Sequence, residues 1–294
     1  MTMTSPSRAV PSRAALLTHL RDSKIAGEVA TPRENNILHY RLLADRDPHY
    51  LLGLDPSPDW TAESVLELMA ARVGVSPDSR HRSGIDTIDP ELTVAALDRY
   101  ADRLALAAAR RETVLLATGH PSSLARLYQG FADVLRGHGC PILRAGEGWG
   151  YEASSRYGPR RLTIGYPAAY SGSSPSSTSS RPGDIAALED AGRPVHSHAA
   201  RPIRATFAAL AAEGRALPDL VVADHGWCGG AAQAGADAIG FADCNDPALF
   251  VGEYEGVVRV AVPLDDGLDP AVYEPIGDYV LGRLDDAVRA PADS

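Results

Sequence analysis

Four short polar clusters contain the residues of this chain that are best suited to chemistry. They are Gly119-His120-Pro121, His196-Ser197-His198, Asp224-His225-Gly226 and Asp243-Cys244-Asn245-Asp246. Imidazoles and carboxylates bind divalent metal ions, and they also transfer protons near neutral pH. Each cluster follows an apolar segment with the length of a β-strand. Because ligands of an open parallel α/β sheet bind beyond the carboxyl ends of its strands, we expect the clusters to form one site.

Several residues of these clusters have the chemistry of metal ligands. His196 and His198 lie on the same side of an extended segment, and paired imidazoles are typical ligands of zinc, manganese or iron. Asp224 closes the most apolar segment, where a charge without a partner is costly. Asp246 also has the alternative of capping a helix that starts at Pro247. The predicted metal ligands are Asp224, Asp243, Asp246, His196 and His198.

Other polar residues of the clusters indicate contacts with an anionic substrate. Gly119 permits a tight turn and Ser122 is a good N-cap, so a helix start there would offer backbone N–H groups to a phosphate. Expected substrate contacts are Gly119, Ser122, Ser123, Gly226 and Asn245, and expected catalytic residues are His120, His225 and Arg201. His120 or His225 would protonate the leaving oxygen, and Arg201 would take the developing phosphoryl charge. The alternative for each cluster is a polar turn between a strand and a helix.

The elements that would position these clusters change character along the chain. Residues 1–11 are rich in Ser, Thr, Pro and Arg and predict a disordered tail. Residues 12–111 have helical periodicity and form a predicted helical region or cap, with no strand expected. Helix starts are predicted at Ser12, Thr31-Pro32, Thr61 and Asp89-Pro90.

Residues 112–294 alternate apolar and helical segments, which predicts an α/β domain. The expected strands are 113–118, about 141–143, 194–195, 219–223, 238–242 and 257–262, and the expected helices are 124–136, 202–213 and 269–288. This alternation predicts parallel βαβ units. The expected fold class is therefore α/β, a doubly wound, mostly parallel Rossmann-like sheet with an N-terminal helical region. A segment rich in Ser, Gly and Pro at about 166–183 predicts a flexible insertion or lid.

Composition excludes several classes of protein. With 38 acidic and 28 basic residues among 294, the net charge is −10, and without a basic stripe no nucleic acid is expected as a partner. The apolar runs are far shorter than the ~18–20 residues of a membrane helix, so no membrane partner is expected. Three scattered cysteines and a polar start without an export signal predict a cytoplasmic, reduced protein. A homo-oligomer is compatible with the sequence.

Four stretches of the chain resemble a family of actinobacterial proteins labelled phosphatases. They are 25–41 (IAGEVATPRENNILHYR), 86–99 (DTIDPELTVAALDR), 115–124 (LLATGHPSSL) and 217–253 (LPDLVVADHGWCGGAAQAGADAIGFADCNDPALFVGE). The resemblance covers most of the chain and fails over about 145–190. It implies phosphatase activity. Because the chain has no DxDx[TV], Arg-His-Gly or Cys-x5-Arg motif, the sequence does not support a covalent phosphoryl intermediate.

These observations lead to one expected function and two alternatives. We expect a metal-dependent phosphomonoester hydrolase for a small phosphorylated metabolite, with one or two divalent ions, Mg²⁺, Mn²⁺ or Zn²⁺, as cofactor. The first alternative is an isomerase, lyase or cyclase that uses Asp and His for proton transfer on a phosphorylated or carboxylated substrate. The second is a protein that binds an anionic ligand without turnover. Phosphate release and turnover distinguish the three.

Overall fold

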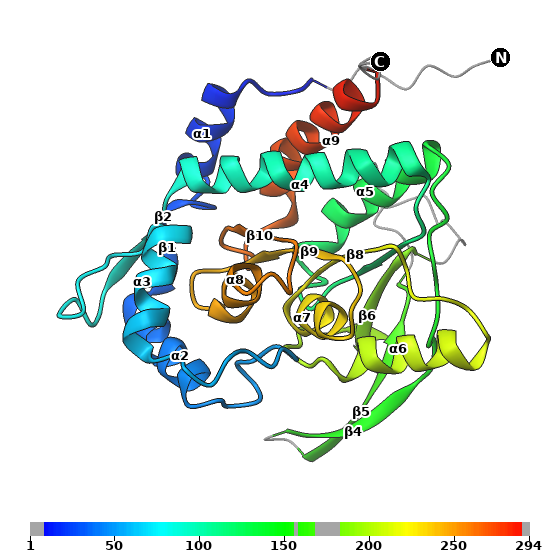
Figure 1. The fold of residues 1–294 in the computed structure, drawn as a ribbon, viewed down its shortest axis with the longest axis horizontal. Helices are drawn as coiled ribbons and strands as arrows, with labels where there is room; N and C mark the ends of the chain where they lie inside the picture. Colours follow the sequence, from blue (N-terminus) through cyan, green and yellow to red (C-terminus); the bar gives the residue numbers. More distant parts are fainter. Residues whose placement is uncertain (1–8, 156–157, 168–182, 290–294) are drawn as a thin grey trace.

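The computed structural model describes residues 9–155, 158–167 and 183–289. The predicted tail and the predicted Ser-rich insertion lie mostly outside these residues. The described residues form a layered α/β structure around one large sheet (Figure 1).

Eight strands of the described residues form a mixed, mostly parallel sheet. Its order is β10 (Val260–Pro263), β9 (Ala238–Ala242), β8 (Leu220–Asp224), β3 (Val114–Ala117), β6 (Ile185–Asp190), β5 (Gly158–Gly165) and β4 (Gly150–Ser155), with β7 (Arg193–Pro194) paired to β6. The strands from β10 to β6 are parallel, whereas β5, β4 and β7 pair antiparallel. The predicted α/β class with a mostly parallel sheet is confirmed.

Helices lie on both faces of the sheet (Figure 1). On one face α4 (Pro90–Arg110) contacts β10 and α5 (Ala125–Gly137) contacts β3, with α9 (Glu274–Arg289) packed against both helices. On the other face lie α7 (His225–Gln233) and α8 (Pro247–Tyr254), with α6 (Arg201–Ala212) beside α7. The helices that follow the neighbouring strands β3 and β8 thus lie on opposite faces. This is the topological switch point of the sheet, where such folds bind ligands.

The prediction that residues 12–111 contain no strand is wrong. Besides α1 (Arg13–Asp22), α2 (Arg33–Ala44) and α3 (Ala62–Arg72), this region contains an antiparallel pair, β1 (Gly27–Pro32) and β2 (Ile85–Ile88). These strands are short and far apart in the sequence, and β1 contains Gly and Pro, which strands disfavour. Strands β4, β5 and β6 were not predicted either, and the expected strand at 141–143 is a single bridge from Ile142 to Val114.

The four predicted helix starts of this region are confirmed. Ser12, Thr61 and Asp89 each accept a hydrogen bond from a backbone N–H of the first helical turn. Thr31 is different, because it lies in β1 and α2 begins at Arg33 without a side-chain cap. The hydroxyl of Thr31 donates instead to Asp243, the residue that directly follows β9.

The N-terminal elements and the α/β elements share one hydrophobic core. It extends from Leu16 and Leu20 of α1 through the strands to Leu284 of α9. A short 3-10 helix (Pro270–Tyr273) precedes α9, so the predicted helix at 269–288 is interrupted once. In the described part of the chain, no helix combines the length and the apolar character that a bilayer crossing requires.

Candidate active site

The strand pair β6 and β7 returns the chain to the switch point. β6 begins beside the end of β3, with Ile185 opposite Leu116, and then runs beyond it. β7 turns back antiparallel to β6, and the Ser197 N–H then donates to the Gly119 carbonyl at 3.0 Å. His196 and His198 therefore reach the predicted sheet edge. They do so after a two-residue antiparallel strand, whereas the sequence predicted a parallel one.

The loops after β3 and β8 touch directly. The Gly119 N–H donates to an Asp224 carboxylate oxygen at 2.9 Å. A Cβ atom at position 119 would lie 2.5 Å from the Ser197 carbonyl oxygen and 2.9 Å from His225 Nδ1. Only glycine lets the three segments approach this closely.

The backbone of His225 is strained. Its φ of 46° lies in the left-handed region, which residues other than glycine rarely adopt. A Cβ at the next residue, Gly226, would lie 2.3 Å from the His198 carbonyl oxygen. Backbone strain of this kind persists where the surrounding structure imposes it, and it is concentrated at functional sites. Here it turns the His225 side chain into the space between the loops.

Four imidazoles and three carboxylates meet at this point, and we call them the imidazole cluster. Its members are His120, His196, His198, His225, Asp224, Asp246 and Asp266. The ring of His225 lies 4.2 Å, between centroids, from the rings of both His120 and His198, and the ring of His196 lies 4.3 Å from that of His120. His225 Nε2 lies 2.8 Å from Asp246 Oδ2. His120 Nδ1 lies 3.5 Å from Asp224 Oδ2 and 3.4 Å from Asp266 Oδ2.

The electrostatics keep two of these imidazoles neutral. Burial, together with the neighbouring imidazoles, lowers the pKa of His196 to about 4 and that of His198 to about 3. Both rings therefore keep a lone pair at neutral pH. Burial acts in the same direction on His225, but Asp246, Asp266 and Asp224 outweigh it and raise the pKa of His225 to about 10.

The cluster has the composition of a metal site. Among the described residues, five of its buried atoms have no hydrogen-bond partner: Nδ1 of His120, His198 and His225, Oδ1 of Asp224 and Oδ2 of Asp266. Two groups, His198-His225-Asp246 and His120-His196-His225, each bring their donor atoms within 4.8 Å of one another. Because unpartnered buried polar atoms are costly and these types bind divalent cations, the residues present fit such an ion.

Two residues of the site, Asp266 within the cluster and His49 beside it, were not predicted from the sequence. Asp266 follows β10, and the rule that found the other clusters would have found it, since Asp265-Asp266 comes two residues after the predicted strand 257–262. The Ser123 hydroxyl holds it by donating to the Asp266 carbonyl at 2.5 Å. His49 comes from the loop between α2 and α3 and stacks on His198, with centroids 4.8 Å apart and an interplanar angle of 5°. No pattern in the sequence indicated His49.

Some predicted site residues lie apart from the donor atoms. Asp243 accepts hydrogen bonds from the Thr31 hydroxyl and the Cys244 N–H, and it belongs to neither group of donors. Burial raises the pKa of Asp243 well above its usual range, and Asp266 and Asp265 add to this effect. The backbone carbonyl of Asn245 contacts His39 Nδ1 at 2.7 Å.

Two residues that could have capped helices, Ser122 and Asp246, do not do so with their side chains. The prediction that Ser122 caps a helix is wrong, because residues 121–124 form a turn, Ser122 is exposed and α5 begins at Ala125. Asp246 occupies the N-cap position of α8 but makes no capping hydrogen bond with its side chain. Its carboxylate bonds His225 instead.

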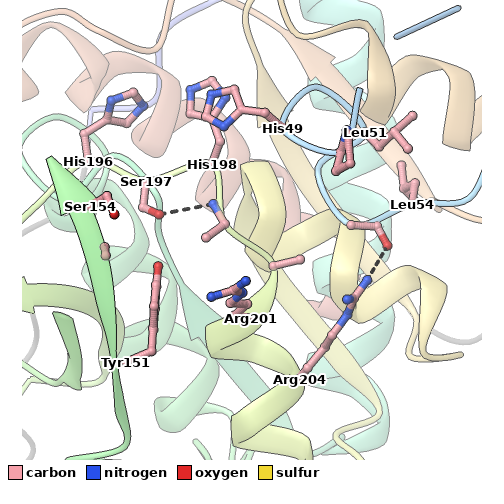
Figure 2. Close-up of a pocket in the computed structure, with 15 residues that line it drawn as sticks. His49, Leu51, Leu54, Tyr151, Ser154, His196, Ser197, His198, Arg201 and Arg204 are labelled. Atoms are coloured by element: carbon pink, nitrogen blue, oxygen red, sulfur yellow. Dashed lines mark hydrogen bonds between the residues drawn. The ribbon is translucent and has the colours of Figure 1, made fainter. Parts of the chain in front are cut away.

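A cavity of about 800 Å³ opens beside the cluster. Figure 2 shows His49, His196 and His198 along one side of this cavity. Across from them lie Tyr151 of β4 and the two arginines of α6, Arg201 and Arg204. Arg201, expected at the reacting phosphoryl group, thus lies beside Tyr151, with its guanidinium carbon 5.4 Å from the centre of that ring.

Comparison with known proteins identifies the family of this chain. A family model described as Phosphatase matches residues 11–288. Phosphatase SCO2771 of Streptomyces coelicolor is 47% identical over 278 residues, which are 94% of this chain and 97% of that protein. These matches confirm the resemblance to actinobacterial phosphatases. The chain belongs to the Phosphatase family.

Proposed function

We propose that the protein is a metal-dependent phosphomonoesterase that acts on a small phosphorylated metabolite at the imidazole cluster. The observation that carries this proposal is the set of unpartnered buried donors at the switch point, next to a cavity of metabolite size. Membership of the Phosphatase family supports the reaction class. The metal and the substrate are parts of the proposal.

His198, His225 and Asp246 are the residues that we propose hold a divalent ion, with Asp224 and Asp266 beside them. The ion would take the place of the proton that the neighbouring carboxylates favour on His225, so metal binding would release a proton. Asp266 takes the place that the sequence analysis gave to Asp243. The abundance of imidazole favours Zn²⁺ or Mn²⁺ over Mg²⁺, which prefers oxygen ligands and water. When bound, such an ion polarises phosphoryl oxygens and activates water for attack.

His120 is the better of the two imidazoles predicted to protonate the leaving oxygen. Its side chain is 14% exposed, whereas that of His225 is 1% exposed and bonds Asp246. The Nδ1 atom of His120 faces Asp224 and Asp266, so its Nε2 atom is the one that can hold a proton for the substrate. His196 lies against His120 and positions its ring.

The test is phosphate release from a panel of sugar and nucleotide monophosphates after treatment with a chelator. We expect release only when Mn²⁺, Zn²⁺ or Mg²⁺ is restored, with about one ion bound per chain by mass spectrometry of the metal. His198→Asn should lose both the ion and the activity, whereas His138→Asn, at the end of α5 and outside the cluster, should keep them.

Release that is unaffected by chelation would refute metal dependence. Conversion without phosphate release would favour an isomerase, lyase or cyclase, and binding without turnover a binding protein.

A further inference from the structure

The cavity is larger than the reaction at the imidazole cluster requires. A volume of about 800 Å³ is in the range of pockets that bind whole metabolites or cofactors. The side across from the histidines has a chemistry of its own, with two guanidinium groups and one phenol ring (Figure 2). We call this part of the cavity, formed by Arg201, Arg204 and Tyr151, the arginine side.

The arginine side carries positive charge that the described residues leave uncompensated. None of the residues described along the cavity is Asp or Glu. Arg201 has no carboxylate partner in the part of the chain that the structure describes, and its guanidinium lies over the Tyr151 ring. Arg204 donates one hydrogen bond, to the Gly53 carbonyl at 3.1 Å.

Arginines elsewhere in the molecule are compensated differently. Arg33 pairs with Asp86 at 2.8 Å, and Arg103 pairs with Asp237 and Glu112 at 2.7 Å each. Although the chain has a net charge of −10, one cavity wall therefore carries two guanidinium groups without a carboxylate partner. A guanidinium presents a planar fork of donors that matches a carboxylate or a phosphate, so this wall is suited to an anion from outside.

We propose that the arginine side binds a second anionic group of the substrate, so that the preferred substrate is a phosphomonoester with a carboxylate or a further phosphate on its leaving alcohol. The reacting phosphate would lie at the histidines and the second anion at Arg201 and Arg204, with the carbon skeleton against Tyr151. The inference rests on the proposed function for the reaction, whereas binding at the arginines does not require turnover.

The experiment compares two pairs of compounds that differ by one anionic group. They are 6-phosphogluconate against glucose 6-phosphate, for a carboxylate, and fructose 1,6-bisphosphate against fructose 6-phosphate, for a phosphate. We expect kcat/KM to be about tenfold or more higher for the doubly anionic member of at least one pair, as charge-assisted bidentate contacts allow. Whichever pair shows the preference identifies the second anion.

Arg201→Gln should remove this preference, because kcat/KM for the doubly anionic member falls by about tenfold more than kcat/KM for the singly anionic member. Because the side chain of Arg201 makes no hydrogen bond among the described residues, this variant is expected to keep the thermal stability of the parent. Arg215→Gln removes the same charge beyond the end of α6, where Arg215 pairs with Glu213 outside the cavity. This control should keep the preference.

The outcomes separate this inference from the proposed function. Equal kcat/KM within both pairs, or a preference that survives Arg201→Gln, would overturn the inference and leave the phosphatase proposal standing. If no compound is hydrolysed, calorimetric titration of the same four compounds decides. Tighter binding of a doubly anionic member that is lost in Arg201→Gln would support the arginine side without the reaction, and equal or absent binding would overturn both.

Discussion

Asp224 has two oxygen atoms with different surroundings, and this difference defines its place in the site. One oxygen accepts the Gly119 N–H at 2.9 Å, and the other is buried without a hydrogen-bond partner among the described residues. Burial alone would raise the pKa of Asp224, but His120 and His225 outweigh it and leave that pKa below its usual value. The carboxylate is therefore ionised at neutral pH, as a metal ligand must be.

Asp224→Asn keeps the shape of this side chain and removes its charge. We expect kcat to fall by about 100-fold or more, because the change weakens metal binding and no longer holds the His120 ring in place. Circular dichroism and thermal melting should show that the fold survives. Asp286→Asn, an exposed change in α9, serves as the control of equal charge. Full activity of Asp224→Asn would remove this residue from the mechanism.

Gly119→Ala tests the close approach of the three loops. The added methyl group would meet the Ser197 carbonyl oxygen at 2.5 Å, so the loops must separate. We expect a loss of about 1–3 kcal/mol in unfolding free energy, typical of overpacking, together with lower kcat. Gly130→Ala is the matched control, because a Cβ there, inside α5, meets nothing within 4 Å. Chemical denaturation of both variants should show opposite signs, with Gly130→Ala gaining about 0.5–1 kcal/mol.

Among the elements, the strand pair β1 and β2 connects the N-terminal helices to the site. Asp86 of β2 forms a buried ion pair with Arg33 of α2 at 2.8 Å and accepts a hydrogen bond from Asn36 at 2.8 Å. Thr31 of β1 donates to Asp243 at the end of β9. The buried ion pair between Arg33 and Asp86 therefore holds the pair of strands β1 and β2 against α2, and β1 contacts the end of β9.

Asp86→Asn should destabilise the protein by about 3–5 kcal/mol, because it leaves the Arg33 charge buried without a partner. Burial raises the pKa of Asp86, but the hydrogen bonds from Arg33, Ser76 and Asn36 outweigh burial and lower it. The stabilisation by a carboxylate with a lowered pKa is complete above its unfolded pKa of about 3.9 and is lost as pH falls through the folded value. We therefore expect the difference between parent and variant to shrink below about pH 4.

Urea titrations of parent and variant at a series of pH values measure this difference. Asp78→Asn, which affects an exposed ion pair with Arg80, is the control and should change stability little at any pH. A difference between parent and Asp86→Asn that is constant down to pH 3 would show that the ion pair does not stabilise the fold as described.

In the molecule as a whole, residues from the beginning to the end of the described chain share one hydrophobic core. The site lies at the edge of that core and brings together loops after β3, β7, β8, β9 and β10. An ion bound there would connect segments that are far apart in the sequence. Since an ion that binds only the folded state stabilises it by mass action, metal content and global stability should change together.

Metal removal should therefore lower the melting temperature. At a free metal concentration about 100 times its Kd, the stabilisation is about 2.7 kcal/mol, which corresponds to several degrees. Differential scanning calorimetry with chelator and with Mn²⁺ or Zn²⁺ measures the shift. His198→Asn should abolish it and His138→Asn should preserve it. A melting temperature that does not respond to any of these ions would contradict the proposed metal site.

Much of this molecule is determined by local sequence. Runs such as Leu220–Asp224 are apolar up to the final aspartate because both faces of the strand are covered, and they predicted the parallel strands. The caps at Ser12, Thr61 and Asp89 follow from side chains that bond a nearby backbone N–H. Since parallel strands end at one edge, the strand pattern also brought His120, Asp224 and His225 to a common place in the prediction.

Only the tertiary structure decided the contacts between distant segments. The reversal of β6 into β7 delivers His196 and His198, His49 arrives from a loop of the N-terminal region, and β1 and β2 exist only because they pair with each other. Asp243 and Asp246 follow the same strand, yet one bonds Thr31 and the other bonds His225. Such choices depend on which side chain lies opposite in space, and neither residue type nor local spacing contains that information.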